Sequence, residues 1–244
     1  MNERRTSFLA VLIVGVLAAG CAESDPVESD RPTAGGASTP TTATTSSPAA
    51  ADQPAPPASE PTAESVDYRV TYEWGAPSDQ VTVPHSAVTL DPSGPSLPYL
   101  VAVYVGDHPD EDPPYQRIAF YFREAFPEYN LQYVREVVQE GSGEPIELEG
   151  NAFLRVGFVN AQAHDNDGAS TVETAPNETI GFFNLKSYGS AGDFEGHLTF
   201  GLGLQVAPDS DQVLLIRAGE LKRPDGTGDF YYVVHVDVQT GLFG

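Results

Sequence analysis

The feature that most constrains the fold is a strict alternation of apolar side chains in several short segments. Residues 118–122 read Ile-Ala-Phe-Tyr-Phe, residues 101–105 read Val-Ala-Val-Tyr-Val, and residues 232–238 place Tyr or Val at every second position. A period of two puts every second side chain on the same face of an extended strand. Since Gly, Pro and Asp clusters bound these segments, we expect half-buried strands.

Other segments share this strand-like character, being rich in β-branched and aromatic residues. They are residues 68–72, 131–137, 152–158, 180–188, 196–205 and 213–217. Residues 124–139 come nearest to a helix, but Pro127 and the β-branched run that follows favour a strand. The predicted fold is all-β, a β-sandwich or a partly closed barrel of antiparallel strands.

The N-terminus has a different pattern, typical of export. Arg4 and Arg5 precede an uncharged apolar run at residues 8–17, and Ala18-Ala19-Gly20 follows directly. A basic start, an apolar core and small residues before a cleavage site describe a secretory signal peptide, here residues 1–20. The apolar run is short of the ~20 residues that a membrane-spanning helix needs.

The only cysteine, Cys21, follows the small residues directly. This position is similar to the acceptor thiol of a bacterial lipoprotein signal, so lipidation of Cys21 is predicted. Leu is usual three residues before that cysteine, whereas here Ala18 occupies the place and Leu17 lies one step earlier. The alternative is an ordinary signal peptide cleaved in the Ala-rich stretch. A lipidated Cys21 leaves no thiol for a disulfide.

Between the cysteine and the β-rich segments the composition changes completely. Residues 21–65 are rich in Pro, Thr, Ala and Ser and contain almost no large apolar side chains. Such a segment cannot bury enough surface to offset the entropy of ordering, so a disordered tether is predicted. The remaining residues, 66–244, suit one β domain.

The charge balance limits the partners. The chain has 12 Lys and Arg against 35 Asp and Glu, a formal net charge of −23. Nucleic acid is excluded as a partner because phosphate binding needs a basic surface. Membrane contact should run through the lipid alone, since anionic headgroups would repel the domain. Solubility outside the cell explains the acidity; cation binding is the alternative.

Several segments resemble the AMIN-like domain that occurs in many actinobacterial lipoproteins and secreted proteins. They are residues 117–122, 127–134, 150–156, 163–165, 192–196, 199–204 and 231–238. The most specific is Gly-Asp-Phe-Glu-Gly at 192–196, and the resemblance spans residues 99–238.

The resemblance implies a β-sandwich, because the better-known AMIN domain is one and directs cell-wall amidases and envelope machines to peptidoglycan. A peptidoglycan or envelope-protein ligand is implied by analogy only. One departure concerns residue 200, where such proteins often carry Trp after Thr and this chain has Phe200. A sugar contact through an indole N–H is therefore not expected there.

The segment 192–204 is the predicted binding region. Asp193 and Glu195 could accept hydrogen bonds from sugar hydroxyls or peptide amides, and Phe194 or Tyr188 could offer a stacking face. The alternative is a purely structural segment, in which residues 201–203 (Gly-Leu-Gly) form a bulge. A glycosidase-like carboxylate pair formed by Asp193 and Glu195 is a further alternative, without a supporting pattern.

Enzymatic and metal motifs are missing from the sequence. It has no Gly-x-Ser-x-Gly elbow, and its five histidines show no metal-binding spacing. The acidic segments 107–112 and 164–168 could hold calcium, but the second lacks the first and last ligands of an EF-hand loop, which favours solvated turns. No cofactor or metal is predicted.

The sequence therefore predicts a lipoprotein on the outer face of the cell membrane that carries a non-catalytic binding domain. Peptidoglycan or an envelope protein is the expected partner. The alternative is a cell-wall hydrolase that uses surface carboxylates.

Overall fold

The computed structural model describes residues 67–88, 90, 94–207 and 213–240. The predicted signal peptide, Cys21 and the tether lie outside these residues. Ten strands and no helix occur in the described part, and no segment of it qualifies as a membrane-spanning helix. The strands are β1 (Asp67–Gly75), β2 (Val81–Val83), β3 (Tyr99–His108), β4 (Tyr115–Arg123), β5 (Glu128–Val134), β6 (Ala152–Val159), β7 (Leu185–Phe194), β8 (His197–Leu204), β9 (Ile216–Pro224) and β10 (Phe230–Gln239).

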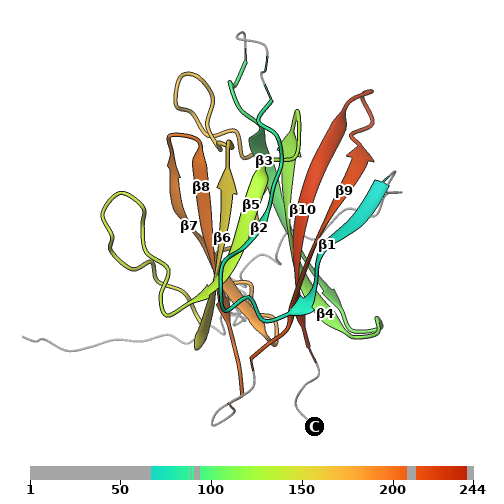
Figure 1. The fold of residues 1–244 in the computed structure, drawn as a ribbon, viewed down its shortest axis with the longest axis vertical. Coiled ribbons are helices and arrows are strands. Elements are labelled where there is room, and N and C mark those ends of the chain that lie inside the picture. Colours follow the sequence, from blue (N-terminus) through green and yellow to red (C-terminus); the bar gives the residue numbers. More distant parts are fainter. Residues whose placement is uncertain (1–66, 89, 91–93, 208–212, 241–244) are drawn as a thin grey trace, which may run out of the picture. The chain divides into compact units, whose positions relative to one another are not determined.

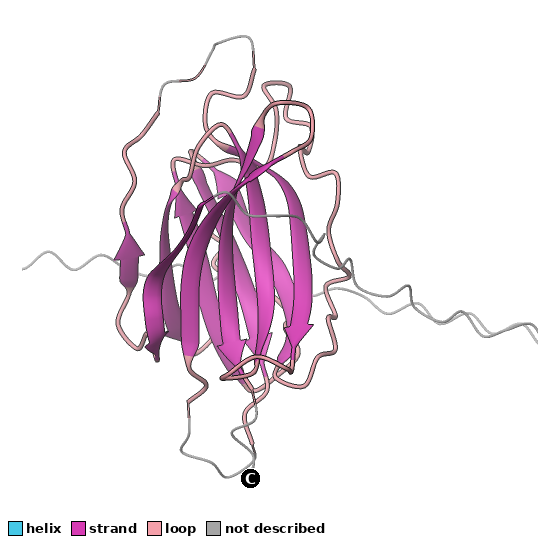
Figure 2. Cartoon of the chain, turned by 90° about the vertical axis from the view of Figure 1, so that its right-hand side faces the viewer, coloured by secondary structure: helices cyan, strands magenta, loops and turns pink. Residues whose placement is uncertain are grey.

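The strands form two antiparallel sheets that pack face to face (Figure 1). One sheet has the order β1-β9-β10-β4-β3, and the other has the order β2-β5-β6-β8-β7. Figure 2 shows the strands running roughly along one common direction. This confirms the predicted all-β fold and, of the two predicted architectures, the sandwich.

The main core lies between the sheets and contains one face of the predicted alternation. The prediction of half-buried strands is wrong for β4, because its other face is buried too: Ala119 and Tyr121 belong to a second apolar cluster on the outer side of their sheet. Phe120 and Phe122 on β4 are fully buried, and Phe158 on β6 and Phe200 on β8 meet them from the opposite sheet. The ring centroid of Phe120 lies 5.1 Å from that of Phe158 and 5.0 Å from that of Phe200. Replacing such a buried ring by Ala costs about 3–5 kcal/mol, so this cluster stabilises the pairing of the two sheets.

Several predicted strands have different bounds in the structure, and the short β2 was not predicted. The predicted strand 131–137 already ends at Val134, and the strand predicted at 180–188 begins only at Leu185. The segment predicted at 213–217 continues to Pro224 as β9. The prediction stopped too early because β9 continues with Ala218, Gly219 and buried Glu220, which do not read as a strand.

A bulge at the glycines of 201–203 was the structural alternative for this segment, and the structure does not show one there. The extra residues in the β7–β8 ladder lie on β7, where the register shifts between Leu185 and Ser187 and between Ser190 and Gly192. On β8 the glycines permit close approach instead. A Cβ at Gly203 would collide with the carbonyl oxygen of Glu149, and a Cβ at Gly201 would lie 2.8 Å from the Leu148 side chain.

Two buried carboxylates are fixed by cationic partners. Asp237 on β10 is fully buried and accepts hydrogen bonds from Arg117 (Nε–Oδ1 2.6 Å) and Arg217 (Nη2–Oδ2 2.7 Å). Burial alone would raise the pKa of Asp237, but hydrogen bonds from His235 and Arg117 outweigh it and hold that pKa well below its usual range. Glu220 on β9 pairs with Arg69 at 2.7 Å and with His85 at 2.8 Å.

Candidate functional site

The predicted binding segment forms the tip of a tight hairpin between β7 and β8. Glu195 and Gly196 occupy the turn with φ of 50° and 77°. Positive φ at both central residues is typical of a type I′ turn, which matches the twist of the flanking strands. Phe194 is 67% exposed beside the turn, so its ring is open to solvent.

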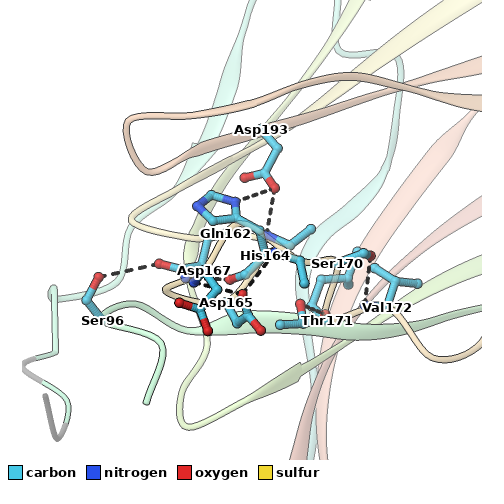
Figure 3. Close-up of polar contacts among 12 residues, drawn as sticks. Ser96, Gln162, His164, Asp165, Asp167, Ser170, Thr171, Val172 and Asp193 are labelled. Atoms are coloured by element: carbon cyan, nitrogen blue, oxygen red, sulfur yellow. Dashed lines mark hydrogen bonds and ion pairs between the residues drawn. The ribbon is translucent and has the colours of Figure 1, made fainter. Parts of the chain in front are cut away.

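Asp193 is held by the loop that follows β6 (Figure 3). Its Oδ2 accepts a hydrogen bond from the backbone N–H of Ala163 at 3.1 Å and lies 2.7 Å from Nδ1 of His164. The sequence singled out residues 164–168 and Asp193 separately, and the structure brings them together. One oxygen of Asp193 is therefore committed to positioning this loop.

Residues 164–168 form the solvated turn that was favoured for them. Asp165 Oδ1 accepts hydrogen bonds from the backbone N–H groups of Asp167 and Ala169, both at 2.9 Å. A carboxylate that caps its own turn is a common use of Asp in loops. Within the described ranges, no three His, Cys, Asp or Glu side chains gather as a metal site would require.

Tyr188 lies apart from the hairpin turn, five residues before Asp193 on β7. It is 7% exposed, its hydroxyl donates a hydrogen bond to the carbonyl oxygen of Pro176 at 3.0 Å, and its ring stacks on Phe200. Burial raises its pKa to about 12. Tyr188 therefore belongs mainly to the core, which argues against its predicted stacking role, and its remaining surface lines a separate hollow of about 730 Å³.

A second region at the same end of the sandwich has the shape of a binding site. We call it the Tyr99 groove, after one of its lining residues. It has a volume of about 570 Å³ and is lined by β3, β4, β10, the β9–β10 turn and the loop after β6. Its aromatic residues are Tyr99, Phe230 and Tyr232, of which Tyr232 also packs on Phe126 and the core. Its other polar side chains include Arg123, Thr171, Glu173 and Asp229.

The groove adjoins a second hollow of about 360 Å³. Val101, Glu173 and Asp225 line both, and the second hollow adds the rings of Tyr104, Tyr121 and Tyr231. Ligand sites are typically hollows of about 300–1,000 Å³ with apolar walls and a few placed polar groups. Each hollow lies within this size range, and because they share part of their walls we call the two together the trough.

The loop between β6 and β7 forms one wall of the groove. The Glu173 N–H donates to the carbonyl of Val101 at 2.8 Å, and the Val103 N–H donates to the carbonyl of Thr174 at 2.8 Å. These bonds cover the edge of β3, which protects it from pairing with another chain. The same loop contacts the hairpin through His164, so it connects the hairpin with the groove (Figures 1 and 3).

The opposite wall is fixed by Asp225 in the β9–β10 turn. Its Oδ1 accepts from the Thr227 N–H at 2.8 Å, and its Oδ2 pairs with Arg123 at 2.6 Å. The Thr227 backbone N–H and Arg123 hold the pKa of Asp225 well below its usual range. Arg123 also lies 4.2 Å from the centroid of Tyr231. This arginine therefore already has an anion and an aromatic ring as partners.

The pKa of the Tyr99 hydroxyl reflects the charges around the groove. Burial raises this pKa most, and the negative charge of Glu124 raises it next. The positive charge of Arg123 lowers it, while Glu173 and Asp229 raise it further. Glu124 has a φ of 75°, a left-handed conformation that costs a non-glycine residue on the order of 1 kcal/mol. Strain of this kind is often found at functional sites.

The fold defines the class of the protein as an antiparallel β-sandwich domain. A family model of the AMIN-like domain matches residues 98–220, slightly more than half of the chain, so the chain belongs to this family. This membership indicates a peptidoglycan-related binding domain and an extracytoplasmic setting. No curated protein and no solved structure matches the chain.

Sequence reasoning missed the Tyr99 groove. One signal was present: the alternation of β10 places Tyr231 on the opposite face from Tyr232 and Val234, among the residues between the apolar positions of the pattern. The approach of residues 170–174 to the β9–β10 turn had no such signal. It depends on the path of an irregular loop, which has no periodicity to read.

Proposed function

We propose that the protein is an extracytoplasmic lipoprotein whose β domain binds peptidoglycan without catalysis. In this proposal residues 1–20 are the signal peptide, a lipid on Cys21 anchors the chain, residues 21–65 form the tether and residues 66–244 form the binding domain. The basic and apolar N-terminal pattern before Cys21 supports the anchor, and the AMIN-like family supports the ligand class.

The observation that carries the proposal is the trough at one end of the sandwich. Aromatic rings beside hydroxyl, carboxylate and guanidinium groups suit a glycan, since flat rings pack against sugar rings and polar groups meet hydroxyls and amides. We propose that a wall polymer lies in the trough. Asp193, Phe194 and Glu195 of the adjacent hairpin are proposed to contribute flanking contacts.

Retention on isolated cell walls tests this function. The full chain carrying Cys21→Ser removes the lipid from the assay, and protein-free walls exclude capture through an envelope protein. We expect retention above that of an unrelated acidic protein. Tyr99→Ser should lower the affinity about tenfold, the loss of a stacking contact worth roughly 1.4 kcal/mol.

The matched control is Tyr68→Ser, because Tyr68 is an exposed tyrosine (46%) on β1 that does not line the groove. It should change retention less than about twofold. No retention of the parent chain, or equal losses for the two variants, would contradict the proposal. Mass spectrometry of the protein from cell membranes tests the lipid on Cys21 separately.

A wall hydrolase is the second candidate. The 2.7 Å contact between His164 Nδ1 and Asp193 Oδ2 favours it, since a carboxylate can orient a histidine as a general base. Turnover of soluble muropeptides by the full chain, abolished by His164→Ala and by Asp193→Asn, would establish this candidate and displace the non-catalytic one.

A further inference from the structure

The second hollow of the trough is built around three tyrosine rings. Tyr121 on β4 is 1% exposed, while Tyr104 on β3 and Tyr231 on β10 are partly exposed. The ring centroid of Tyr121 lies 5.0 Å from that of Tyr104 and 5.5 Å from that of Tyr231, at interplanar angles of 71° and 69°. Two partly open rings therefore stand steeply against a buried third ring.

Contacts within the domain fix these rings. The Tyr121 hydroxyl accepts a hydrogen bond from Arg223 Nη1 at 3.0 Å, and the Arg123 guanidinium lies 4.2 Å from the centroid of Tyr231. Val101 and Ala102 of the second apolar cluster complete the lining between the rings. A groove whose walls are already ordered loses little entropy when it binds a ligand.

The tether joins the domain level with this hollow. Tyr68, the second residue of β1, begins a row of paired residues that crosses the sheet through Leu221, Val233, Tyr121 and Ala102. In the strand order β1-β9-β10-β4-β3, three spacings of ~4.8 Å separate β1 from β4 and four separate β1 from β3. The tyrosines thus lie ~14–19 Å across the sheet from the start of β1.

The chain that leads to β1 is rich in proline. Residues 54–57 read Pro-Ala-Pro-Pro, the densest proline cluster of the tether. Residues 58–66 separate this cluster from Asp67, and at ~3.1 Å per residue they span up to ~28 Å when extended. The cluster is therefore long enough in reach to lie on the tyrosines of its own domain.

We infer that the proline-rich segment 54–57 docks in the tyrosine-lined hollow of its own chain as a polyproline II helix. Aromatic-lined grooves recognise such helices because prolines pack on the rings and the helix has little conformational entropy to lose. A polyproline II helix places Pro54 and Pro57 ~9.3 Å apart, close to the ~9.6 Å of the two strand spacings between β3 and β10.

The docked segment occupies part of the trough, so it competes with the wall polymer. This consequence rests on the proposed function, whereas the docking itself does not. A second copy of the chain carries the same proline cluster, but it would have to bind from solution. The chain's own segment has an effective concentration in the millimolar range because its connection is short.

A spin label tests the docking without any wall material. The full chain carrying Cys21→Ser and Ala58→Cys takes a nitroxide beside Pro57, and nitrogen-15 spectra record which amides are broadened. We expect broadening at Tyr104 and Thr174, which line the hollow on the far side of the sheet from β1. The amide of Leu148, which packs on β7 and β8 of the other sheet, should stay sharp.

Replacing the prolines removes the helix geometry but leaves the fold untouched. Pro54→Ala, Pro56→Ala and Pro57→Ala together should reduce the broadening at Tyr104 about threefold, since alanine does not preset the extended conformation. The matched control replaces three tether prolines outside the segment, Pro32→Ala, Pro40→Ala and Pro48→Ala, and should leave the broadening unchanged.

Two results would overturn the docking. One is broadening that is confined to β1 and β9 or that persists in full after the replacement of Pro54, Pro56 and Pro57. The other is broadening of a nitrogen-15 chain without a label by a labelled nitrogen-14 chain, which would make a second copy the occupant.

Retention on cell walls tests the competition separately. Replacement of the three prolines at 54, 56 and 57 should raise the affinity about threefold, the gain expected if the segment blocks about two thirds of the molecules. Unchanged retention would overturn the competition and leave the docking in place. No retention of any variant would contradict the proposed function, while the spin-label result would still decide the docking.

Discussion

The hairpin and the Tyr99 groove lie at the same end of the sandwich, yet they use their carboxylates in opposite ways. In the hairpin, Asp193 Oδ2 is engaged by the Ala163 N–H and by His164, while its buried Oδ1 has no hydrogen-bond partner in the described residues. In the groove, the exposed Glu173 and Asp229 have no cationic partner in the described part of the chain. A carboxylate oxygen that is bound within the fold holds its elements in place, whereas exposed carboxylates around a hollow are open to a ligand.

The same contrast extends through the domain. Asp237, Glu220 and Asp225 all have basic partners at 2.6–2.8 Å. These acids hold strands and turns in place. The net charge alone could not distinguish them from the acids of the groove, because both kinds count equally toward −23.

The largest effect on stability is expected for Asp237→Asn. The change leaves Arg117 and Arg217 without their buried carboxylate, and breaking such a pair costs about 3–5 kcal/mol. Chemical denaturation of the full chain measures it. An exposed control, Asp167→Asn, should change the free energy of unfolding by less than about 0.5 kcal/mol. If both variants changed the free energy of unfolding equally, the distinction between acidic residues that stabilise the fold and acidic residues that are open to solvent would be wrong.

Low pH should reduce the difference in unfolding free energy between the parent chain and Asp237→Asn. The pKa of Asp237 is lower in the folded state than in the unfolded state, so its stabilisation is complete above about pH 4, the unfolded value, and disappears as pH falls through the folded value. The difference in unfolding free energy between the parent chain and Asp237→Asn should therefore shrink below pH 4. A constant difference from pH 7 to pH 2 would contradict the assignment.

Asp193→Asn should have a smaller effect on stability, about 1 kcal/mol, because the contact with His164 is partly exposed. Since its Oδ2 positions the loop and only a flanking contact with the ligand is proposed for Asp193, wall retention should fall by no more than about twofold. Thermal unfolding and wall retention measured on the same preparation test both statements. A tenfold loss of retention with unchanged stability would make Asp193 a main ligand contact instead of a flanking one.

The smallest effect is expected for Phe194→Ser. The ring is 67% exposed, so its loss should change stability by less than about 0.5 kcal/mol. As a flanking contact it should change retention about twofold to threefold, less than Tyr99→Ser. Retention of both variants on the same cell walls tests this order. If Phe194→Ser lost more retention than Tyr99→Ser, the hairpin and not the groove would be the main binding site.

The sequence predicted the fold well because the sandwich depends on local alternation. Ile118, Phe120 and Phe122 read as one buried face, and they form the centre of the core. The β7–β8 hairpin was not predicted, because residue 196 was placed in a strand; its turn is visible only in the positive φ values of Glu195 and Gly196. The groove was not, because it joins Tyr99, Glu173 and Asp229 from three distant segments.

The role of Asp193 illustrates why the remainder could not be predicted. Its position beside Phe194 and Glu195 suggested a ligand contact, but its neighbour in space is His164, 29 residues earlier. Glycines gave a similar result: Gly203 suggested a bulge, while the actual reason for glycine there is the close approach of Glu149. The roles of Asp193 and Gly203 both depend on contacts between loops and strands that are far apart in the sequence.

Mapping of the ligand contacts by NMR tests the central claim most directly. The full chain carrying Cys21→Ser is labelled with nitrogen-15 and titrated with soluble muropeptides released from cell walls. The account predicts that the largest chemical-shift changes fall on the amides of Tyr99, Glu173 and Tyr231, with smaller changes at Phe194. Changes confined to the 193–197 hairpin, or none at all, would contradict it.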